Sequence, residues 1–267
     1  MSASLLLVFA LNGCAARNQS MQIMKVPEET WDASDKDVVR LELVRALMSR
    51  GLYQDALTLI GELRKSGAGG DELDLMQAEC LIGLGLHTEA EQLLSRGMSR
   101  NPERYRLQGL SYLDQKRVDE AIEQFELALR FTPKRGADHE RALLHNNLGF
   151  ALASDGQHLA AIDEFSSALL LDPSLSRARN NLGFSLAALG RDEEAFSVFR
   201  AVQESQTSSP LTSEANAYYN LGLARAARGD ADGARQSLSR ALELAPDHER
   251  ARDALASLTE PNTPESP

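Results

Sequence analysis

A pattern of small and large apolar residues repeats along most of the chain. Its clearest copy places a Leu-Gly pair ahead of two small residues, one aromatic residue and a proline: Leu148, Gly149, Ala161, Phe165, Ala168 and Pro173. The spacing within each half puts these residues on one face of a helix, and the proline ends the second helix. Each copy therefore predicts a hairpin of two helices joined by a tight turn.

An alanine at the position of Ala161 marks six copies of this pattern. The recurring alanines are Ala56, Ala90, Ala121, Ala161, Ala195 and Ala234. Successive alanines are 34, 31, 40, 34 and 39 residues apart. The two longer intervals contain polar insertions, around residues 134–140 and 205–213, whose Ser, Thr, Gly and charged residues indicate loops. One hairpin cannot bury its own apolar face, so six in series predict stacked units that depend on their neighbours.

This period resembles that of the tetratricopeptide repeat, which is about 34 residues. The resemblance covers roughly residues 37–248 and implies an all-α, right-handed α-solenoid of about six hairpins. We expect six repeat units over residues 37–246, an amphipathic capping helix over 247–259 and a tail, 260–267, that is disordered by composition. Ala251, Leu255 and Leu258 form the apolar side of the capping helix.

Glycine and alanine explain how such hairpins close. Glycine occupies five of the predicted turns, at Gly51, Gly85, Gly156, Gly190 and Gly229, where it ends a helix with φ > 0 at no steric cost. Lys116 stands in the sixth, which predicts a tighter or less regular turn. Gly149 is expected to face Ala161, so that the helices approach closely, while Phe125, Phe165 and Phe199 fill the space between hairpins.

The N-terminus carries a short apolar run, Leu5–Leu11, followed by Asn12, Gly13 and Cys14. The run is too short to cross a bilayer, which takes about 20 helical residues. It resembles a bacterial lipoprotein signal, with Leu11, Gly13 and Cys14 matching the lipobox and Asn12 departing from it. The resemblance implies a signal peptide over 1–13, lipidation at Cys14 and a tether over 14–36. No basic residue precedes the run, and a short buried N-terminal segment is the alternative interpretation.

Composition argues against several classes of function. The formal charge of −11, with lysine and arginine scattered, gives no basic surface for nucleic acid. No motif for catalysis, nucleotides or metal is present, so we expect no enzyme activity, no cofactor and no metal. Cys80 is interpreted as a packed, inert thiol, and His145 as a partner contact or a solvated side chain. Asp230 and Asp232 resemble the start of a calcium loop that lacks its later ligands, so a hairpin turn explains them better.

The first helices of tetratricopeptide hairpins line the concave face, and the resemblance implies that a partner protein binds there. The positions carried over to units four to six are Leu143, Asn146, Phe150, Arg177, Asn180, Phe184, Asn216, Tyr219 and Leu223. Aromatic side chains offer buried area and amides offer hydrogen bonds to a backbone, so an extended or helical segment with apolar anchors is the expected ligand. Asn147, Asn181 and Asn220 are interpreted as structural hydrogen-bonding residues.

Repeats combined with a lipobox are similar to outer-membrane assembly factors of bacterial pilus and secretion machines, such as TadD-like lipoproteins of Tad (Flp) systems and type IV pilotins. This implies a lipid-anchored protein on the periplasmic face of the outer membrane. Two alternatives stay open: a periplasmic adaptor that recruits a protease or cell-wall enzyme, and a cytosolic scaffold if residues 1–14 are not processed. An enzyme fused to the repeats is disfavoured, because no segment outside them is long enough for a catalytic domain.

Overall fold

The computed structural model describes residues 33–96, 100–204 and 210–259, and over these ranges it contains thirteen helices and no strand. The all-α prediction is therefore confirmed. Contacts divide the chain into two compact units, Met1–Gly69 and Gly70–Pro267. The first holds α1 (Ala33–Ser49) and α2 (Tyr53–Lys65), and α1 begins inside the expected tether.

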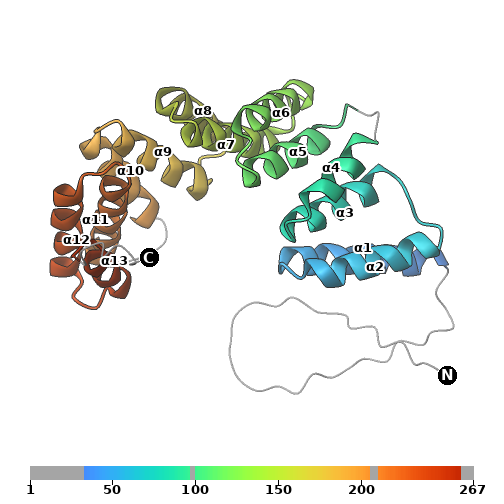
Figure 1. Ribbon diagram of the computed structural model, residues 1–267, viewed down its shortest axis with the longest axis horizontal. Coiled ribbons are helices and arrows are strands. Elements are labelled where there is room, and N and C mark those ends of the chain that lie inside the picture. Colours follow the sequence, from blue (N-terminus) through green and yellow to red (C-terminus); the bar gives the residue numbers. More distant parts are fainter. Residues whose placement is uncertain (1–32, 97–99, 205–209, 260–267) are drawn as a thin grey trace, which may run out of the picture. The chain divides into compact units, whose positions relative to one another are not determined.

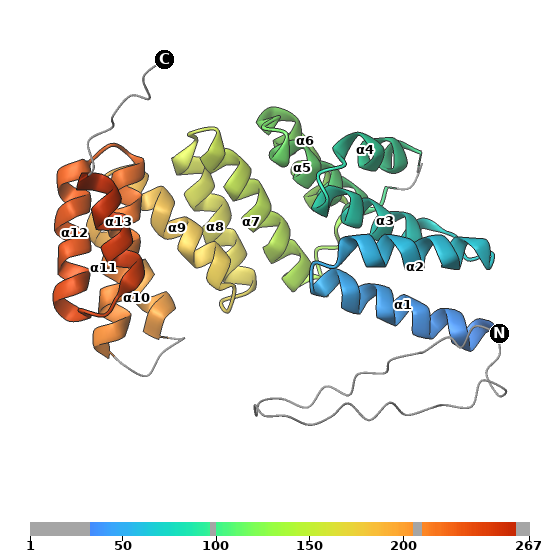
Figure 2. The ribbon, with the colours of Figure 1, turned by 60° about the horizontal axis from the view of Figure 1, so that its bottom comes forward.

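The helices of the second unit alternate as first and second members of hairpins (Figures 1 and 2). They are α3 (Asp71–Gly83), α4 (His87–Ser95), α5 (Pro102–Asp114), α6 (Val118–Phe131), α7 (Asp138–Ser154), α8 (His158–Leu171), α9 (Ser176–Ala188), α10 (Asp192–Glu204), α11 (Pro210–Ala227), α12 (Ala231–Leu244) and α13 (Glu249–Thr259). Each first helix packs on the second helix of its own hairpin. First helices of successive hairpins also contact one another, as α3 does α5, α7 does α9 and α9 does α11. The first helices therefore lie together on one side, which we call the first-helix face.

The first unit is a single hairpin with its own small core. Val44 of α1 and Ala56, Ile60 and Leu63 of α2 are fully or almost fully buried. Ala56 occupies the position of the other recurring alanines, so the faintest copy of the sequence pattern folds in the same way as the clearer ones.

Within a hairpin, the glycine of the first helix lies against a phenylalanine of the second. A Cβ at Gly149 would come within 2.8 Å of the Phe165 ring, and one at Gly183 within 2.5 Å of the Phe199 ring. The nearest neighbour of the glycine is thus the aromatic ring four residues after the alanine, rather than the expected alanine itself. Glycine is required because a bare Cα leaves room for the ring to lie flat on the helix.

The same rings also reach the next hairpin. Phe199 belongs to a buried cluster with Ala217, Leu221 and Ala224 of α11. Phe125 belongs to a cluster that includes Leu148 and Ala151 of α7. The expectation that phenylalanines fill the space between hairpins is confirmed for Phe125 and Phe199, whose rings each contact the following hairpin.

The turn at Lys116 has the same geometry as the glycine turns, so the prediction of a tighter or less regular turn was wrong. Lys116 adopts φ +61°, in the left-handed region where Gly156 has φ +78°. Its amide donates to the carbonyl of Leu113 (2.9 Å), as the amide of Gly156 does to that of Ala153 (3.1 Å). The hairpin imposes this conformation, and lysine, which has a Cβ, adopts it at a cost in strain.

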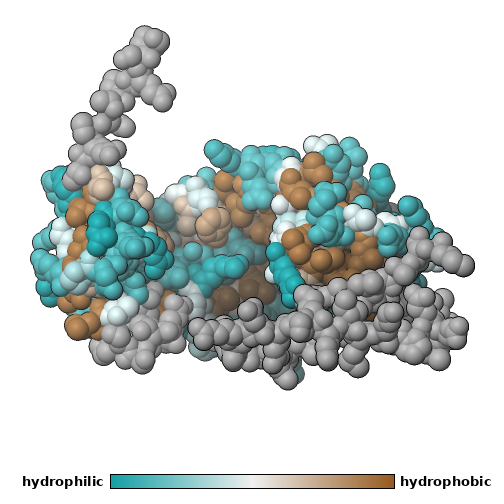
Figure 3. Space-filling model, turned by 90° about the horizontal axis from the view of Figure 1, so that it is seen from below, coloured by the Kyte–Doolittle hydropathy of each residue, from teal (hydrophilic) through white to brown (hydrophobic). Residues whose placement is uncertain are grey.

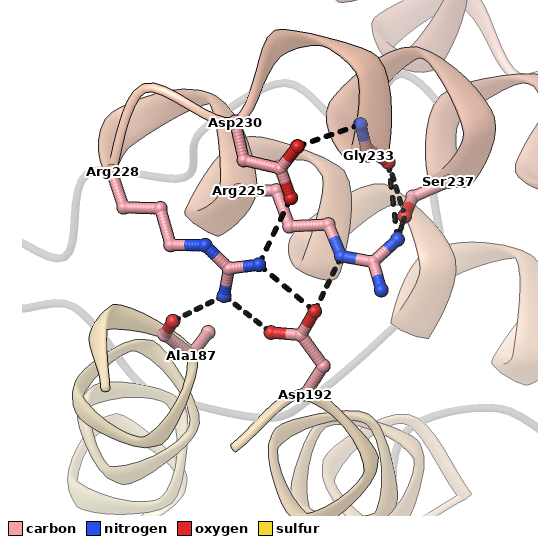
Figure 4. A network of polar contacts seen from close by, with 7 residues as sticks. All are labelled: Ala187, Asp192, Arg225, Arg228, Asp230, Gly233 and Ser237. Atoms are coloured by element: carbon pink, nitrogen blue, oxygen red, sulfur yellow. Dashed lines mark hydrogen bonds and ion pairs between the residues drawn. The ribbon is translucent and has the colours of Figure 1, made fainter. Parts of the chain in front are cut away.

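An ion network joins four successive helices (Figure 4). The Asp192 carboxylate, at the start of α10, accepts hydrogen bonds from Arg225 Nε (2.8 Å) and Arg228 Nη2 (3.0 Å) of α11. Arg228 also donates to the carbonyl of Ala187 in α9, and Arg225 donates to Ser237 Oγ in α12 (2.9 Å). The two guanidinium groups hold the pKa of Asp192 below its usual range, Arg228 contributing most. The network fixes α9 to α12 relative to one another.

The capping helix is present as predicted and begins two residues later than expected, because His248 caps it. The Nδ1 atom of His248 accepts a hydrogen bond from the backbone N–H of Ala251 (3.1 Å). Its Nε2 lies 2.9 Å from Oδ1 of Asn216 in α11, which fits a neutral imidazole with its proton on Nε2. Leu255 and Leu258 pack against buried Leu238 and Ala241 of α12, Ala251 being part of the same cluster.

Candidate protein-binding surface

Two exposed aromatic side chains stand at corresponding positions of the first-helix face. Phe150 of α7 is 48% exposed and Phe184 of α9 is 37% exposed. Each directly follows the glycine that packs against its hairpin's phenylalanine, so the helix turns it outward. Phe184 meets the ring of Phe199 edge-on, with centroids 5.2 Å apart, which holds its orientation. The pair offers apolar area that the fold itself leaves accessible.

Asparagines run between these helices. Asn146 of α7 is buried, its Oδ1 accepts a hydrogen bond from Asn181 Nδ2 of α9 (3.1 Å), and its Nδ2 donates to Asn147 Oδ1 (3.5 Å). Asn181 therefore makes a hydrogen bond between hairpins, as interpreted from the sequence. Asn146, which the sequence places among the partner-facing residues, is used inside the fold.

Asn180 differs from its neighbour. Its Oδ1 atom is buried and has no hydrogen-bond partner among the described residues. Buried amide oxygens in folded proteins almost always accept a hydrogen bond, so this atom is an exception within the described residues.

The start of the capping helix covers the residues of α11 that the sequence predicted to face a partner. Asn216 is bonded to His248, and the Tyr219 ring lies 5.1 Å from the His248 ring and 5.4 Å from the Arg250 guanidinium. Leu223 is half-buried. Sequence patterns could not show this cover, because it depends on where α13 docks.

Two more of the predicted partner-facing residues lie on the same helices as Phe150 and Phe184. Leu143 is half-buried on α7, and Arg177 is exposed in the first turn of α9. With Phe150, Phe184 and Asn180 they form what we call the α7–α9 surface. Figure 3 shows one face of the molecule, on which hydrophobic (brown) and hydrophilic (teal) residues lie side by side.

A second feature lies on α3 and α5, where a hollow of about 390 Å³ is lined by Glu72, Leu75, Met76, Glu79, Asn101 and Glu103. Burial raises the pKa of the Glu79 carboxyl, while nearby Arg106 acts in the opposite direction. Arg106 is itself bonded to Glu103 through Nε (2.7 Å). The hollow forms where α3 packs beside the start of α5, so its lining depends on tertiary packing.

The residues considered for chemistry have structural roles. His145 Nδ1 lies 2.7 Å from Glu164 of α8, so this histidine joins its own hairpin instead of facing a partner or solvent. Cys80 is fully buried, and burial, with Glu79 nearby, raises its thiol pKa to about 11, as expected of an inert thiol. Asp230 caps α12 through the amide of Gly233 (2.9 Å), which agrees with its interpretation as a turn residue.

Within the described ranges, no group of three or more His, Cys, Asp or Glu residues is arranged to hold a metal ion. No helix among the described residues has the length and apolar character needed to span a membrane. Cys14, the expected signal peptide and the tail at 260–267 lie outside the described residues.

Comparison with known protein families identifies the repeats of this chain. Two family models, each described as tetratricopeptide repeat, match residues 174–247 in one case and residues 41–102 and 91–136 in the other. A comparison with curated protein sequences finds no match.

Solved structures similar in fold include RapI in its apo form (14% identity over 84% of this chain and 71% of that chain, TM-score 0.62). A Rap protein complexed with competence and sporulation factor is 19% identical over 84% of this chain and 70% of that chain, with a TM-score of 0.54. MamA from Desulfovibrio magneticus RS-1 is 21% identical over 66% of this chain and 98% of that chain, with a TM-score of 0.51. At these identities the likeness concerns the fold. Because the family models together match more than half of the 267 residues, the chain belongs to the tetratricopeptide repeat family.

Proposed function

We propose that this chain is a non-catalytic scaffold that holds a segment of another protein against its α7–α9 surface. The observation that carries the proposal is the pair of exposed aromatic residues, Phe150 and Phe184, at corresponding positions of adjacent first helices. Exposed aromatic side chains on adjacent helices suit the apolar anchor residues of a bound segment. The Rap protein of similar fold, described in complex with competence and sporulation factor, is consistent with such a role.

The hollow on α3 and α5 indicates which charge the bound segment would carry. Its carboxylates Glu72, Glu79 and Glu103 stand around the apolar side chains of Leu75 and Met76. A bound segment that continues from the α7–α9 surface along the first helices reaches an acidic region, so basic residues toward that end of the segment are favoured.

The test of binding is a capture experiment with a matched control. Immobilised full chain is incubated with a membrane extract, and the captured proteins are compared between the wild type, Phe150→Ala and Leu211→Ala. Leu211 is a similarly exposed apolar residue (59%) away from the α7–α9 surface. We expect Phe150→Ala to lose specific partners and Leu211→Ala to keep them. Equal capture by the two variants would refute the placement of the site.

We further propose that Cys14 is acylated and that the protein serves, on the periplasmic face of the outer membrane, in assembly of a pilus or secretion system of Tad or type IV kind. Support comes from the lipobox-like residues Leu11, Gly13 and Cys14 together with the repeats. Membrane fractionation of Cys14→Ala tests the anchor, because a variant that stays membrane-bound contradicts it. Recovery of a protease or cell-wall enzyme in place of a pilus or secretion component would favour the adaptor alternative.

A further inference from the structure

The outward face of α8 differs from that of the other second helices. Relative to the recurring alanine, the four exposed outward positions carry Asp119, Glu123, Glu126 and Arg130 in α6, and Asp232, Gln236, Ser239 and Glu243 in α12. In α8 the same positions carry Leu159, Asp163, Ser166 and Leu170. Both ends of α8 thus present leucine where α6 and α12 present charge.

These two leucines are highly accessible. Leu170 is 83% exposed and Leu159 is 68% exposed, the highest values among large hydrophobic side chains of the described residues. The hairpin does not use them, because Ala161, Phe165 and Ala168 form the buried side of α8. Leucines this exposed at both ends of one helix face, where α6 and α12 carry charge, are available to contact a partner.

A hollow of about 360 Å³ adjoins this face on the side of α10. Its lining combines the apolar side chains of Ile162, Leu182, Leu186 and Val198 with polar ones, namely Ser166, Ser197 and the bonded pair Arg191 and Glu194. Ile162 is one helical turn from Leu159, so a side chain placed beside Leu159 lies at the edge of this hollow. The exposed leucines of α8 therefore lie beside a hollow of mixed apolar and polar lining.

The order of residues on α8 is symmetric about its middle. Leu159 and Leu170 are equally far from the centre of the helix, and so are Asp163 and Ser166. Two copies of α8 packed antiparallel therefore bring Leu159 of one copy to Leu170 of the other and Asp163 to Ser166. Parallel packing would instead place Asp163 opposite Asp163, and like charges directly opposed repel.

We propose that α8 pairs with α8 of a second copy of this chain, antiparallel and about a two-fold axis, making the outward face of α8 a homodimer interface. The self-complementary order of apolar, acidic and small residues supports a second copy over an unrelated helix. One helix of fourteen residues provides a small interface, below the roughly 1,200 Å² of total buried area that marks weak and transient complexes. We accordingly expect a weak and reversible dimer, which is best sought at micromolar and higher protein concentrations.

Sedimentation velocity over roughly 1–200 μM protein, the range that brackets a micromolar dissociation constant, tests the proposal. The full chain carries Cys14→Ser so that acylation cannot drive association. We expect the sedimentation coefficient of this parent to rise with concentration. Leu159→Lys and Leu170→Glu, each alone, should raise the dissociation constant at least tenfold, whereas Leu211→Lys, an equally polar change on α11, should leave it unchanged. Unaltered helical content and melting temperature confirm that the variants are folded.

An equimolar mixture of the Leu159→Lys and Leu170→Glu chains identifies the orientation. An antiparallel heterodimer contains one Lys–Glu pair and one intact Leu–Leu pair, so the mixture should associate where neither variant does alone. Single variants that stay dissociated on mixing would overturn the antiparallel arrangement. A parent chain that is monomeric throughout, or single variants that associate as the parent does, would overturn the interface and leave the face to a different protein.

Discussion

Replacing Gly183 with alanine isolates the contact that closes each hairpin. In an exposed helix interior this change stabilises by up to about 1 kcal/mol, because glycine has the lower helix propensity. At Gly183, however, the new Cβ would lie 2.5 Å from Cε1 of Phe199 and 2.8 Å from two further ring atoms. Phe199 is fully buried in a cluster with Leu186, so its ring cannot move aside without displacing neighbours. Overpacking of this kind costs about 1–3 kcal/mol, so we expect a net loss of about 1–2 kcal/mol.

Gly61 provides the matched control. It lies within α2, and a Cβ there would meet nothing within 4 Å. Gly61→Ala should therefore stabilise by about 0.5–1 kcal/mol through propensity alone. Thermal unfolding followed by circular dichroism distinguishes the two, since 1 kcal/mol shifts the melting temperature by about 2–4 °C in a domain of this size. A Gly183→Ala variant that melts at or above the wild type would refute the packing argument.

The chain itself suggests a compensating change. In the hairpin of α3 and α4, the corresponding positions are occupied by Ala78 and Leu94, both buried. Gly183→Ala combined with Phe199→Leu reproduces that pair. We expect the double variant to lose less stability than the sum of the two single variants, because the leucine leaves room for the new methyl group. Additive losses would mean that the two positions do not act on each other.

Three further substitutions test single features of the fold by their melting temperatures. Lys116→Gly should stabilise by about 0.5–1 kcal/mol, because glycine relieves the strain of a positive φ, partly offset by greater freedom in the unfolded chain; a lower melting temperature would contradict this. Burial, together with a nearby arginine, lowers the pKa of His248, so its contribution to stability is complete above its unfolded value of about 6.5 and is lost as pH falls through the folded value. His248→Gln should abolish that loss, and an unchanged pH dependence would show that another group is responsible. Asp192→Ala leaves two guanidinium groups without their shared acceptor and should cost about 2–3 kcal/mol, whereas Asp232→Ala, at a side chain 93% exposed, should change little.

The repeat pattern alone was sufficient to predict helical hairpins, their number and the glycine turns. A glycine or alanine recurs every 31 to 40 residues, and a large apolar residue follows it at a short, fixed distance. Such short distances along the chain determine which residues share one face of a helix. The prediction that Phe150 and Phe184 are exposed on first helices followed from the same register. These features depend on residues close together in the chain, so one sequence contains them in full.

Only the tertiary structure decided which residues meet across hairpins. Asn146 and Asn181, 35 residues apart, bond to each other and withdraw Asn146 from the surface. His248 covers Asn216 because α13 docks there, and Lys116 adopts a positive φ because the packing of its two helices requires it. Contacts of this kind depend on the position of one unit against the next, which identical local patterns leave open. The sequence therefore determined the hairpin, and the stacking of hairpins determined the surface.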